Sequence, residues 1–263
     1  MTAALLGVVR ERTPLVHCVT NLVATTLSAN VLLAVGASPA MVEDREEAAE
    51  LAAVAGALVV NTGTMTPERA DGMRAAANAA LDVGTPWLLD PVGVGPLALR
   101  TRVAGELLRL GPAVVRGNAS EILALAGHDG GGRGVDATDS VDDAAAAADE
   151  LARRYGTVVA VSGVVDRLTD GATVRHVRGG HAVMGRMTAT GCALGAVTGA
   201  FLAAARGTGD DSLTAAVAAH AVVGATGAAA GASAAGPGTF VPAWLDALAA
   251  TDGRNADALV DGG

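Results

Sequence analysis

Short apolar runs alternate with longer amphipathic segments along the chain up to residue 162. The runs are rich in Val, Leu and Ala, and Gly or Pro bounds most of them, which is typical of strands buried in a parallel sheet. We expect strands at residues 15–19, 39–42, 57–61, 86–90, 113–116 and 157–162. We expect helices at residues 25–35, 46–55, 67–83, 101–110, 121–126 and 141–155.

The pattern changes after residue 162. In residues 167–181, apolar and polar residues alternate on either side of Asp170–Gly171, and this predicts a β-hairpin. A long Ala/Gly-rich helical region then extends to about Gly236, and the glycine cluster at residues 130–134 predicts a surface loop. The alternation of strands and helices predicts an α/β fold, with a central, mostly parallel sheet and helices on both faces. No segment resembles a long linker, so we expect residues 1–263 to form a single domain.

The composition indicates how the core is built. Hydrophobic residues make up 51% of the chain but aromatic residues only 2%, so small side chains must bring helices and strands close together. Residues 192–205 and 215–235 are apolar enough to be considered as membrane spans. Ala and Gly dominate both, and His220 interrupts the second, so we interpret them as buried helices and expect no membrane association. The N-terminal residues 1–12 lack the pattern of a signal peptide.

Charge and cysteine content narrow the class of protein further. The net charge is −9 and Lys and Arg form no cluster, which argues against a nucleic-acid-binding protein. Cys18 and Cys192 are far apart in the sequence and no CxxC pair exists, so we expect neither a disulfide framework nor a cysteine metal site. These features favour a reducing compartment and a cytoplasmic location.

Polar residues follow several of the predicted strands, where open α/β sheets bind their ligands. Asp90 and Glu121 each follow a strand, and two carboxylates from neighbouring strands can hold Mg²⁺ directly or through water. The alternative is structural: Asp90 forms the turn before Pro91, and Glu121 belongs to the first turn of a helix. Arg116, before Gly117, can bind a nucleotide phosphate or form a surface ion pair. Ser162–Gly163 can bind a phosphate or form a turn.

The segment Thr190–Gly191–Cys192 leads into an apolar helix. A glycine-containing helix start presents free backbone N–H groups, which suits a phosphoryl group and favours a thiolate. The alternative is an ordinary buried cysteine. The chain has neither a GxxxxGK[ST] loop nor a GxSxG motif, and its five histidines have no metal-ligand spacing, so a P-loop enzyme and an α/β-hydrolase are excluded.

Taken together, these motifs resemble those of the hydroxyethylthiazole kinase family. The matching segments run in order from about residue 14 to residue 246: Pro14–Asn21, Gly36–Met41, Asn61–Thr64, Asp90–Val92, Arg116–Glu121, Gly191–Cys192 and Gly236–Phe240. The resemblance implies a ribokinase-like fold without a separate lid domain. It also implies ATP-dependent phosphorylation of the hydroxyl of 4-methyl-5-(2-hydroxyethyl)thiazole in thiamine biosynthesis, with Mg²⁺, by a homotrimer whose active sites lie between subunits.

The same resemblance assigns roles to individual residues. It implies Met41, Gly191 and Asn21 as substrate-binding residues, Arg116 and Ser162 as ATP-binding residues, and Asp90 and Glu121 as the Mg²⁺ site. Cys192 stands where related sugar kinases carry an aspartate base.

Two positions depart from the family pattern, and three other functions remain open. Ala189 stands where the family usually has Gly, and Val164 stands where it often has Glu. The alternatives are a kinase of another ring alcohol, such as a hydroxymethylpyrimidine or a pyridoxal-like compound, an ATP-dependent dehydratase, and a ligand-binding relative without catalysis. Cys192 favours a kinase over the dehydratase, and the presence of Asp90, Arg116, Glu121 and Gly191 together argues against the silent relative.

Overall fold

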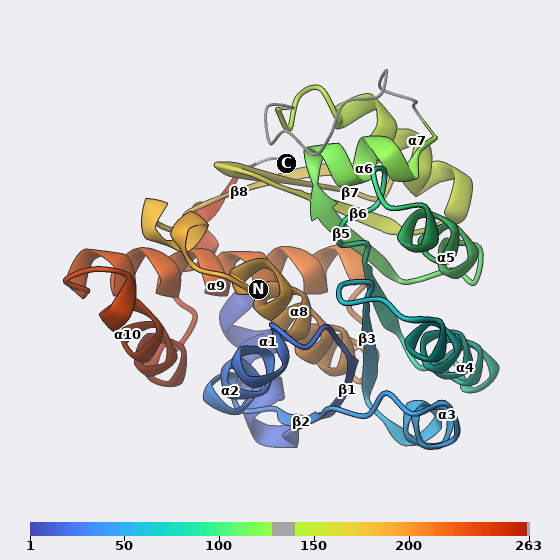
Figure 1. The fold of residues 1–263 in the computed structure, drawn as a ribbon. Coiled ribbons are helices and arrows are strands. Elements are labelled where there is room, and N and C mark those ends of the chain that lie inside the picture. Colours follow the sequence, from blue (N-terminus) through green and yellow to red (C-terminus); the bar gives the residue numbers. More distant parts are fainter. Residues whose placement is uncertain (128–139, 262–263) are drawn as a thin grey trace.

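The strands form one mixed sheet in the computed structural model, which describes residues 1–127 and 140–261 (Figure 1). The strands are β1 (Leu15–Val19), β2 (Ser38–Ala40), β3 (Ala57–Asn61), β4 (Trp87–Asp90), β5 (Val114–Asn118), β6 (Val158–Ser162), β7 (Val165–Thr169), β8 (Val174–Arg178) and β9 (Val260–Asp261). They lie side by side in the order β2-β1-β3-β4-β5-β6-β7-β8-β9. The predicted loop at residues 130–134 lies outside the described residues.

The first six strands are parallel, and β6 to β9 pair in antiparallel fashion. The carboxyl ends of β1, β3, β4, β5 and β6 therefore meet at one edge of the sheet. The register places Asn61 beside Asp90 and Asn118 beside Ser162. Strand β4 pairs with β5, so the condition for Asp90 and Glu121 to approach one ion, that their strands are neighbours, is met.

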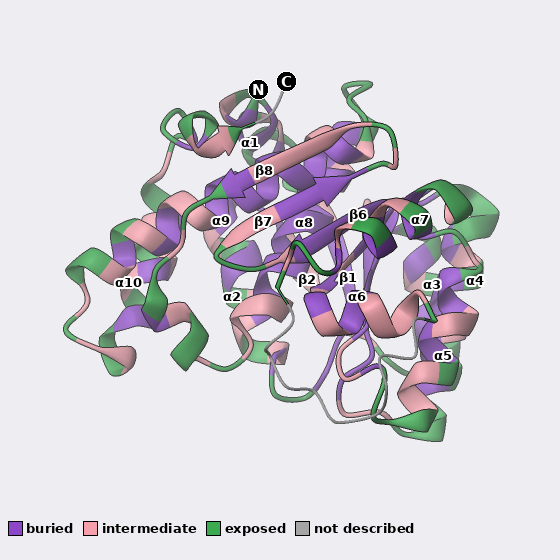
Figure 2. Ribbon diagram, turned by 90° about the horizontal axis from the view of Figure 1, so that it is seen from above, coloured by how far each residue is buried: buried purple, intermediate pink, exposed green. Residues whose placement is uncertain are grey.

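Helices cover both faces of the sheet. They are α1 (Thr2–Arg12), α2 (Thr25–Val35), α3 (Arg45–Val54), α4 (Pro67–Val83), α5 (Ala98–Leu108), α6 (Ala119–Leu125), α7 (Ala145–Tyr155), α8 (Thr190–Arg206), α9 (Ser212–Ser233) and α10 (Pro237–Ala250), with short 3₁₀ helices η1 (Ala182–Arg186) and η2 (Asp257–Leu259). One apolar core joins the sheet to α1, α2, α8, α9 and α10, and a second joins it to α3, α4, α5, α6 and α7. Figure 2 shows the buried residues concentrated in the strands and on the inner sides of these helices.

Local signals explain where the helices begin and end. At the start of α4, the Thr66 side chain accepts a hydrogen bond from the backbone N–H of Arg69, and Pro67 occupies the first helical position. Gly36 after α2 and Gly84 after α4 have φ angles of 101° and 69°, a left-handed conformation that glycine adopts without strain. Both helices have the bounds that the sequence predicted.

The small side chains allow a helix to lie very close to the sheet. A Cβ atom built on Gly199, in the middle of α8, would lie 2.6 Å from Cγ2 of Val59 on β3. This distance is shorter than real carbon contacts, so only glycine fits at this position without a shift. The structure confirms the close approach that the low aromatic content predicted.

The sequence prediction was less accurate near the two ends of the chain. It missed α1, whose Leu5, Leu6 and Val9 are buried against the first core. The predicted hairpin is present as β7 and β8, with Gly171 at a φ of 89° in the turn. The single helical region expected up to Gly236 is divided into η1, α8 and α9, and the separate helix α10 follows it.

Helix α9 is long and apolar enough to cross a membrane by length and composition alone. In its most apolar 18-residue window, 72% of the residues are buried inside the protein. Packing within the fold therefore accounts for its apolarity, as the sequence interpretation expected.

Candidate active site

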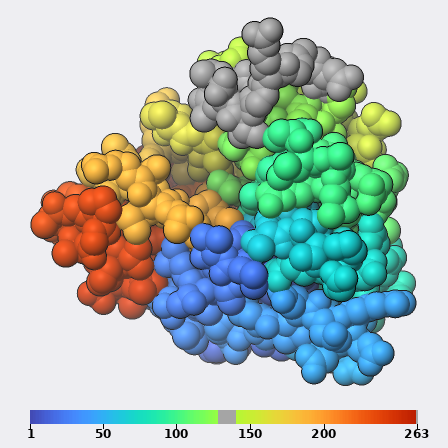
Figure 3. All heavy atoms as spheres, in the orientation of Figure 1, coloured from blue at the N-terminus to red at the C-terminus, as the bar shows by residue number. Residues whose placement is uncertain are grey.

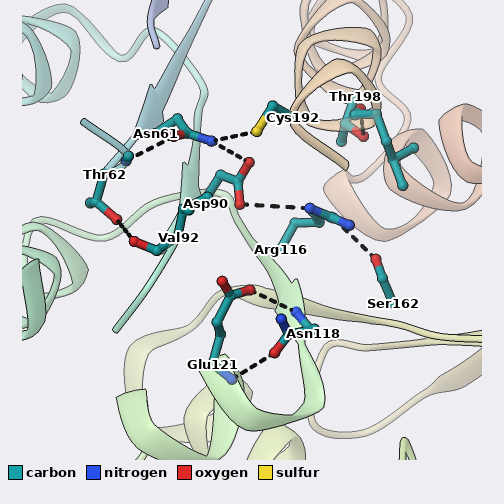
Figure 4. A network of polar contacts seen from close by, with 12 residues as sticks. Asn61, Thr62, Asp90, Val92, Arg116, Asn118, Glu121, Ser162, Cys192 and Thr198 are labelled. Atoms are coloured by element: carbon teal, nitrogen blue, oxygen red, sulfur yellow. Dashed lines mark hydrogen bonds and ion pairs between the residues drawn. The ribbon is translucent and has the colours of Figure 1, made fainter. Parts of the chain in front are cut away.

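Polar side chains from β3, β4, β5, β6 and α8 converge at the carboxyl edge of the sheet (Figure 4), and the loop after β1 adds Asn21. Asn21 follows β1, while Asn61, Asp90 and Ser162 are the last residues of β3, β4 and β6. Arg116 lies within β5, and Cys192 lies in the first turn of α8. Figure 3 shows the N-terminal third of the chain, its middle and the segment that precedes α8 meeting on one face of the molecule.

The sulfur of Cys192 accepts hydrogen bonds from two asparagine side chains. The Nδ2 atoms of Asn21 and Asn61 each lie 3.3 Å from its Sγ atom. Asn61 also accepts a hydrogen bond from Nδ2 of Asn21 at 2.9 Å. Asn21, which the family resemblance implied as a substrate-binding residue, therefore contacts Cys192 in this structure.

Asp90 is the most deeply buried carboxylate of the site, with 1% of its surface exposed. Its Oδ2 atom accepts a hydrogen bond of 2.6 Å from Asn61, and its Oδ1 atom has no hydrogen-bond partner and lies 3.6 Å from Nη1 of Arg116. Burial raises the pKa of Asp90 to about 6, and the negative charge of Glu121 adds to this effect, while Arg116 and Asn61 oppose it. Apart from the ion pair with Arg116, Oδ1 has no partner, and a carboxylate oxygen of this kind is a ligand that Mg²⁺ prefers.

Arg116 connects Asp90 to the other side of the site. Its Nε atom donates a hydrogen bond of 3.0 Å to Oγ of Ser162. A Cβ atom on Gly191 would lie 2.8 Å from Nη1 of Arg116, so the guanidinium lies directly against the start of α8. The structure thus brings together three of the residues predicted from the sequence, Arg116, Ser162 and Gly191.

The start of α8 carries backbone N–H donors beside this guanidinium. The first hydrogen bond within the helix start runs from the N–H of Ala193 to the carbonyl of Ala189, and no side chain caps the helix. The N–H groups of Thr190, Gly191 and Cys192 precede that bond, as is usual for the first turn of a helix. Together with Arg116, they form a site suited to an anion.

Glu121 has a structural role that the sequence presented only as an alternative. Its Oε2 atom accepts a hydrogen bond of 2.9 Å from the N–H of Asn118, and Asn118 in turn caps the N–H of Glu121, forming a capping box at the start of α6. Its Oε1 atom accepts a hydrogen bond of 3.1 Å from the N–H of Gly93. Both carboxylate oxygens are therefore bound to backbone N–H groups, and Glu121 joins the loop after β4 to the start of α6.

The expectation that the helix start favours a Cys192 thiolate is wrong. Burial raises the pKa of the Cys192 thiol to about 11, and the charge of Asp90 raises it further, against the effects of Asn21, Arg116 and Asn61. The sequence could not show this, because the burial of Cys192 and the position of Asp90 depend on the packing of α8 against β4.

Two adjoining cavities lie beside these residues. A cavity of about 480 Å³ is lined by Arg116, Ser162, Gly191 and a largely apolar wall that includes Leu194 and Val223. A cavity of about 600 Å³ adjoins it at residues 162–164 and is lined by Asn118, Ser120 and His176, among others. Val164, which replaces the glutamate frequent in the family, lines both cavities and is 94% exposed.

Met41 lies apart from the hydrogen-bonded network. It follows β2 at the edge of the sheet and packs, partly buried, against the first core.

In residues 1–127 and 140–261, no group of three or more His, Cys, Asp or Glu side chains is arranged to hold a metal ion. Mg²⁺ needs fewer, since it is usually held by one or two carboxylates, water and substrate phosphates.

The sequence interpretation did not identify Asn61 as a site residue, although it lies at the end of a strand beside Asp90. Asn61, like Asp90, is the last residue of a predicted strand, and this position could have identified it. It also missed the pair of Asp166 and the buried His220, whose Oδ2 and Nδ1 atoms lie 2.7 Å apart at the wall of the smaller cavity. Asp166 accepts a hydrogen bond from the N–H of Gly163 and so fixes the turn after Ser162.

We expect Ala189→Gly to stabilise the protein by about 0.5–1 kcal/mol. Ala189 precedes α8 with a φ of 67° and a ψ of 3°, a left-handed conformation that is unfavourable for a residue with a Cβ atom. Glycine adopts it without strain, which gives a physical reason for the glycine usual in the family. The free energy of unfolding, measured by urea denaturation, tests this.

The matched control is Ala75→Gly, in the middle of α4. Glycine at an ordinary helical position is expected to destabilise the protein by about 1 kcal/mol. If both variants lose stability equally, the backbone of Ala189 is not strained.

Comparison with known proteins identifies the relatives of this chain. A model of the hydroxyethylthiazole kinase family matches residues 6–253. A protein of Klebsiella pneumoniae subsp. pneumoniae, named hydroxyethylthiazole kinase, is 55% identical over 246 residues, which are 94% of each chain. A protein of Rhizobium etli with the same name is 50% identical over 254 residues, 97% of each chain.

Solved structures agree with these matches. The structure of a hydroxyethylthiazole kinase from Pyrococcus horikoshii OT3 superposes with a TM-score of 0.89 and 37% identity, covering 100% of this chain and 98% of that one. A pyridoxal kinase from Staphylococcus aureus in complex with pyridoxal superposes with a TM-score of 0.60 and 18% identity over 80% of this chain and 85% of that one, a likeness of fold alone. The expected ribokinase-like fold is confirmed.

Proposed function

This chain belongs to the hydroxyethylthiazole kinase family, and from this membership we infer that it phosphorylates the hydroxyl of 4-methyl-5-(2-hydroxyethyl)thiazole in thiamine biosynthesis. ATP is the co-substrate of such a kinase. The observation that carries this function is the 55% identity to a hydroxyethylthiazole kinase along 94% of both chains. The arrangement of Asp90, Arg116 and Cys192 around the start of α8 supports it, because phosphoryl transfer needs an anion site beside an acceptor site.

We propose that Arg116, Ser162 and the backbone N–H groups around Gly191 bind the phosphates of ATP. Their arrangement beside the smaller cavity supports this role. Met41 and Gly191 contact the thiazole, and Cys192 lies beside its hydroxyl. The hydroxyl oxygen forms a bond to the γ-phosphorus while the bond to the β-phosphate oxygen breaks, and the hydroxyl proton passes to the deprotonated sulfur of Cys192. Arg116 and the N–H groups stabilise the negative charge on the moving phosphoryl group.

We propose that Asp90 holds Mg²⁺ on the phosphates and that Glu121 contributes through water. The Oδ1 atom of Asp90, which has no hydrogen-bond partner, supports the first role. The second is limited to water, because both oxygens of Glu121 accept backbone hydrogen bonds. When bound, the ion neutralises phosphate charge, and Asp90 fixes its position.

A coupled ADP-release assay across candidate alcohols tests the proposed reaction. The thiazole alcohol is expected to give the highest kcat/KM, with a hydroxymethylpyrimidine and pyridoxal far below it. A preference for either of the other rings would contradict the assignment. ATP-dependent dehydration of a substrate, without phosphorylation of an alcohol, would indicate the lyase alternative.

We propose that the protein is a cytoplasmic homotrimer whose active sites lie between subunits. The exposed aliphatic side chains of Leu22 and Val23, directly after Asn21, support a contact surface beside the site, since each is 63% exposed. Sedimentation at assay concentration is expected to give the mass of a trimer. A fully active monomer in that experiment would contradict the shared sites.

A further inference from the structure

Asn61 is the most highly connected side chain of the site. It is 1% exposed and makes four polar contacts. Its Oδ1 atom accepts hydrogen bonds from Nδ2 of Asn21 and from the N–H of Gly63, both at 2.9 Å. Its Nδ2 atom donates to Oδ2 of Asp90 at 2.6 Å and to Sγ of Cys192 at 3.3 Å. An amide has two acceptor sites and two donor hydrogens, so all four are in use.

The backbone fixes which atoms of the two asparagines face the sulfur. A backbone N–H can only donate, so the atom of Asn61 that contacts Gly63 must be oxygen. The N–H of Ala24, 3.0 Å from Asn21, fixes that amide in the same way. The atoms that face Cys192 are therefore the two nitrogens, and the sulfur accepts two N–H hydrogen bonds.

This arrangement constrains the thiol and the carboxylate together. A sulfur that accepts from two amides must direct its own hydrogen, or its remaining lone pair, away from both. Asn61 also holds Asp90 on its other donor hydrogen, so one rigid amide sets the position of the sulfur relative to the carboxylate (Figure 4). Strand β3 supplies the rigidity, because Asn61 is its last residue and pairs in register with Asp90.

We propose that Asn61 is a positioning residue of phosphoryl transfer, whose amide holds the sulfur of Cys192 as a hydrogen-bond acceptor and fixes it relative to Asp90. The inference rests on the proposed function, in which Cys192 lies beside the reacting hydroxyl. Asn61 acts through Cys192 and Asp90. Its loss therefore affects the orientation of the reacting groups more than the binding of substrates.

Asn61→Ala is expected to lower kcat on the order of tenfold or more, because small displacements of reacting groups slow transfer strongly. The KM values for ATP and for the thiazole alcohol are expected to stay close to those of the unmodified protein. The near-isosteric variant Asn61→Leu keeps the volume without adding a charge beside Asp90 but loses both N–H donors, so its kcat is expected to fall as far. If Asn61 only fills space, Asn61→Leu retains kcat, and the proposal is wrong.

The matched control is Thr62→Val, which removes the neighbouring, partly buried hydrogen bond of 3.1 Å from Thr62 to the carbonyl of Val92. This variant leaves the contacts of Cys192 intact and is expected to keep kcat. An equal loss of kcat in Thr62→Val and Asn61→Ala would assign the effect to general loosening of this edge and overturn the proposal.

A spectroscopic measurement separates this inference from the proposed function. The chain has two cysteines, so Cys18→Ala leaves Cys192 as the only thiol. In that background the infrared S–H stretching band of Cys192 is expected to shift on Asn61→Ala and to stay unchanged on Thr62→Val. An unshifted band on Asn61→Ala contradicts the proposal. If the band shifts on Asn61→Ala but the unmodified protein has no thiazole kinase activity, the hydrogen bond from Asn61 to Cys192 is supported and the proposed function is contradicted.

Discussion

Asp90→Asn is expected to lower kcat by roughly 10³-fold, the size of effect seen when a group that stabilises transition-state charge is removed. The same substitution is expected to stabilise the fold. Burial is the main cause that raises the pKa of Asp90 from 3.8 to about 6, so the folded protein disfavours the charged carboxylate. This rise in the pKa of Asp90 corresponds to about 3 kcal/mol of destabilisation of the folded protein above pH 6.

The direction of the pH dependence follows from this shift. Between about pH 4 and 6 the folded state binds a proton at Asp90 more tightly than the unfolded state does, so stability falls as pH rises through this range. Asparagine carries no charge at any of these pH values. The gain from Asp90→Asn is expected to reach about 1–2 kcal/mol, less than the full amount because an asparagine whose oxygen accepts from Asn61 turns its NH₂ group toward the guanidinium of Arg116.

Urea denaturation at neutral pH and near pH 4 tests the prediction. The difference in unfolding free energy between the two proteins should be largest at neutral pH and should nearly vanish near pH 4. A variant that loses activity and stability together would show that the Asp90 carboxylate supports the fold.

Glu121→Gln, at the other residue predicted to hold Mg²⁺, is expected to change stability in the opposite direction to Asp90→Asn. Its carboxylate accepts hydrogen bonds from the N–H groups of Asn118 and Gly93, and glutamine offers one oxygen to the two donors. One backbone N–H is left unpaired, so we expect a loss of about 1–3 kcal/mol in stability beside a lower kcat. Opposite signs of the stability change at Asp90 and Glu121 would separate the functional carboxylate from the structural one.

The sequence predicted the central part of the fold well because its signals are local. Buried strands such as residues 57–61 are continuous apolar runs, and α4 is bounded by Thr66, Pro67 and Gly84. The N-terminal helix α1 was missed because its hydrophobic pattern is weak and its Leu5 and Leu6 are buried by segments far away in the chain. Where long-range packing decides an element, local patterns do not reveal it.

The candidate site was predictable in position but not in its hydrogen bonds. Asp90, Arg116 and Ser162 were predictable because they lie at strand ends, and parallel strands bring their carboxyl ends together. The contact of Asn21 with Cys192 was not predictable, because it joins residues 171 positions apart through the packing of α8. The two roles of Glu121 were indistinguishable in the sequence, because the residue types are the same for a metal ligand and for a capping box.

The pH dependence of turnover should distinguish a base at Cys192 from a packing residue. Burial, with the charge of Asp90, raises the pKa of this thiol to about 11, so only a small fraction of it is deprotonated at neutral pH. A base must be deprotonated to accept the hydroxyl proton, so kcat of the unmodified protein is expected to rise between about pH 7 and 9. Asp90 is already ionised in this range, since its pKa is about 6.

Cys192→Ala and Cys192→Asp test this prediction by opposite effects. Alanine is expected to lower kcat by about 10²-fold near pH 9, the low end for a positioned base because the hydroxyl proton leaves late in a loose transition state. The loss is expected to be smaller at pH 7, where the thiol contributes less. Aspartate is of similar size and supplies a carboxylate that is a competent base at neutral pH, so this variant is expected to stay active with a flatter pH profile. A loss in Cys192→Ala that is equal at both pH values would mean that Cys192 only packs, and phosphoryl transfer would then depend on Asp90, Arg116 and the N–H groups of α8.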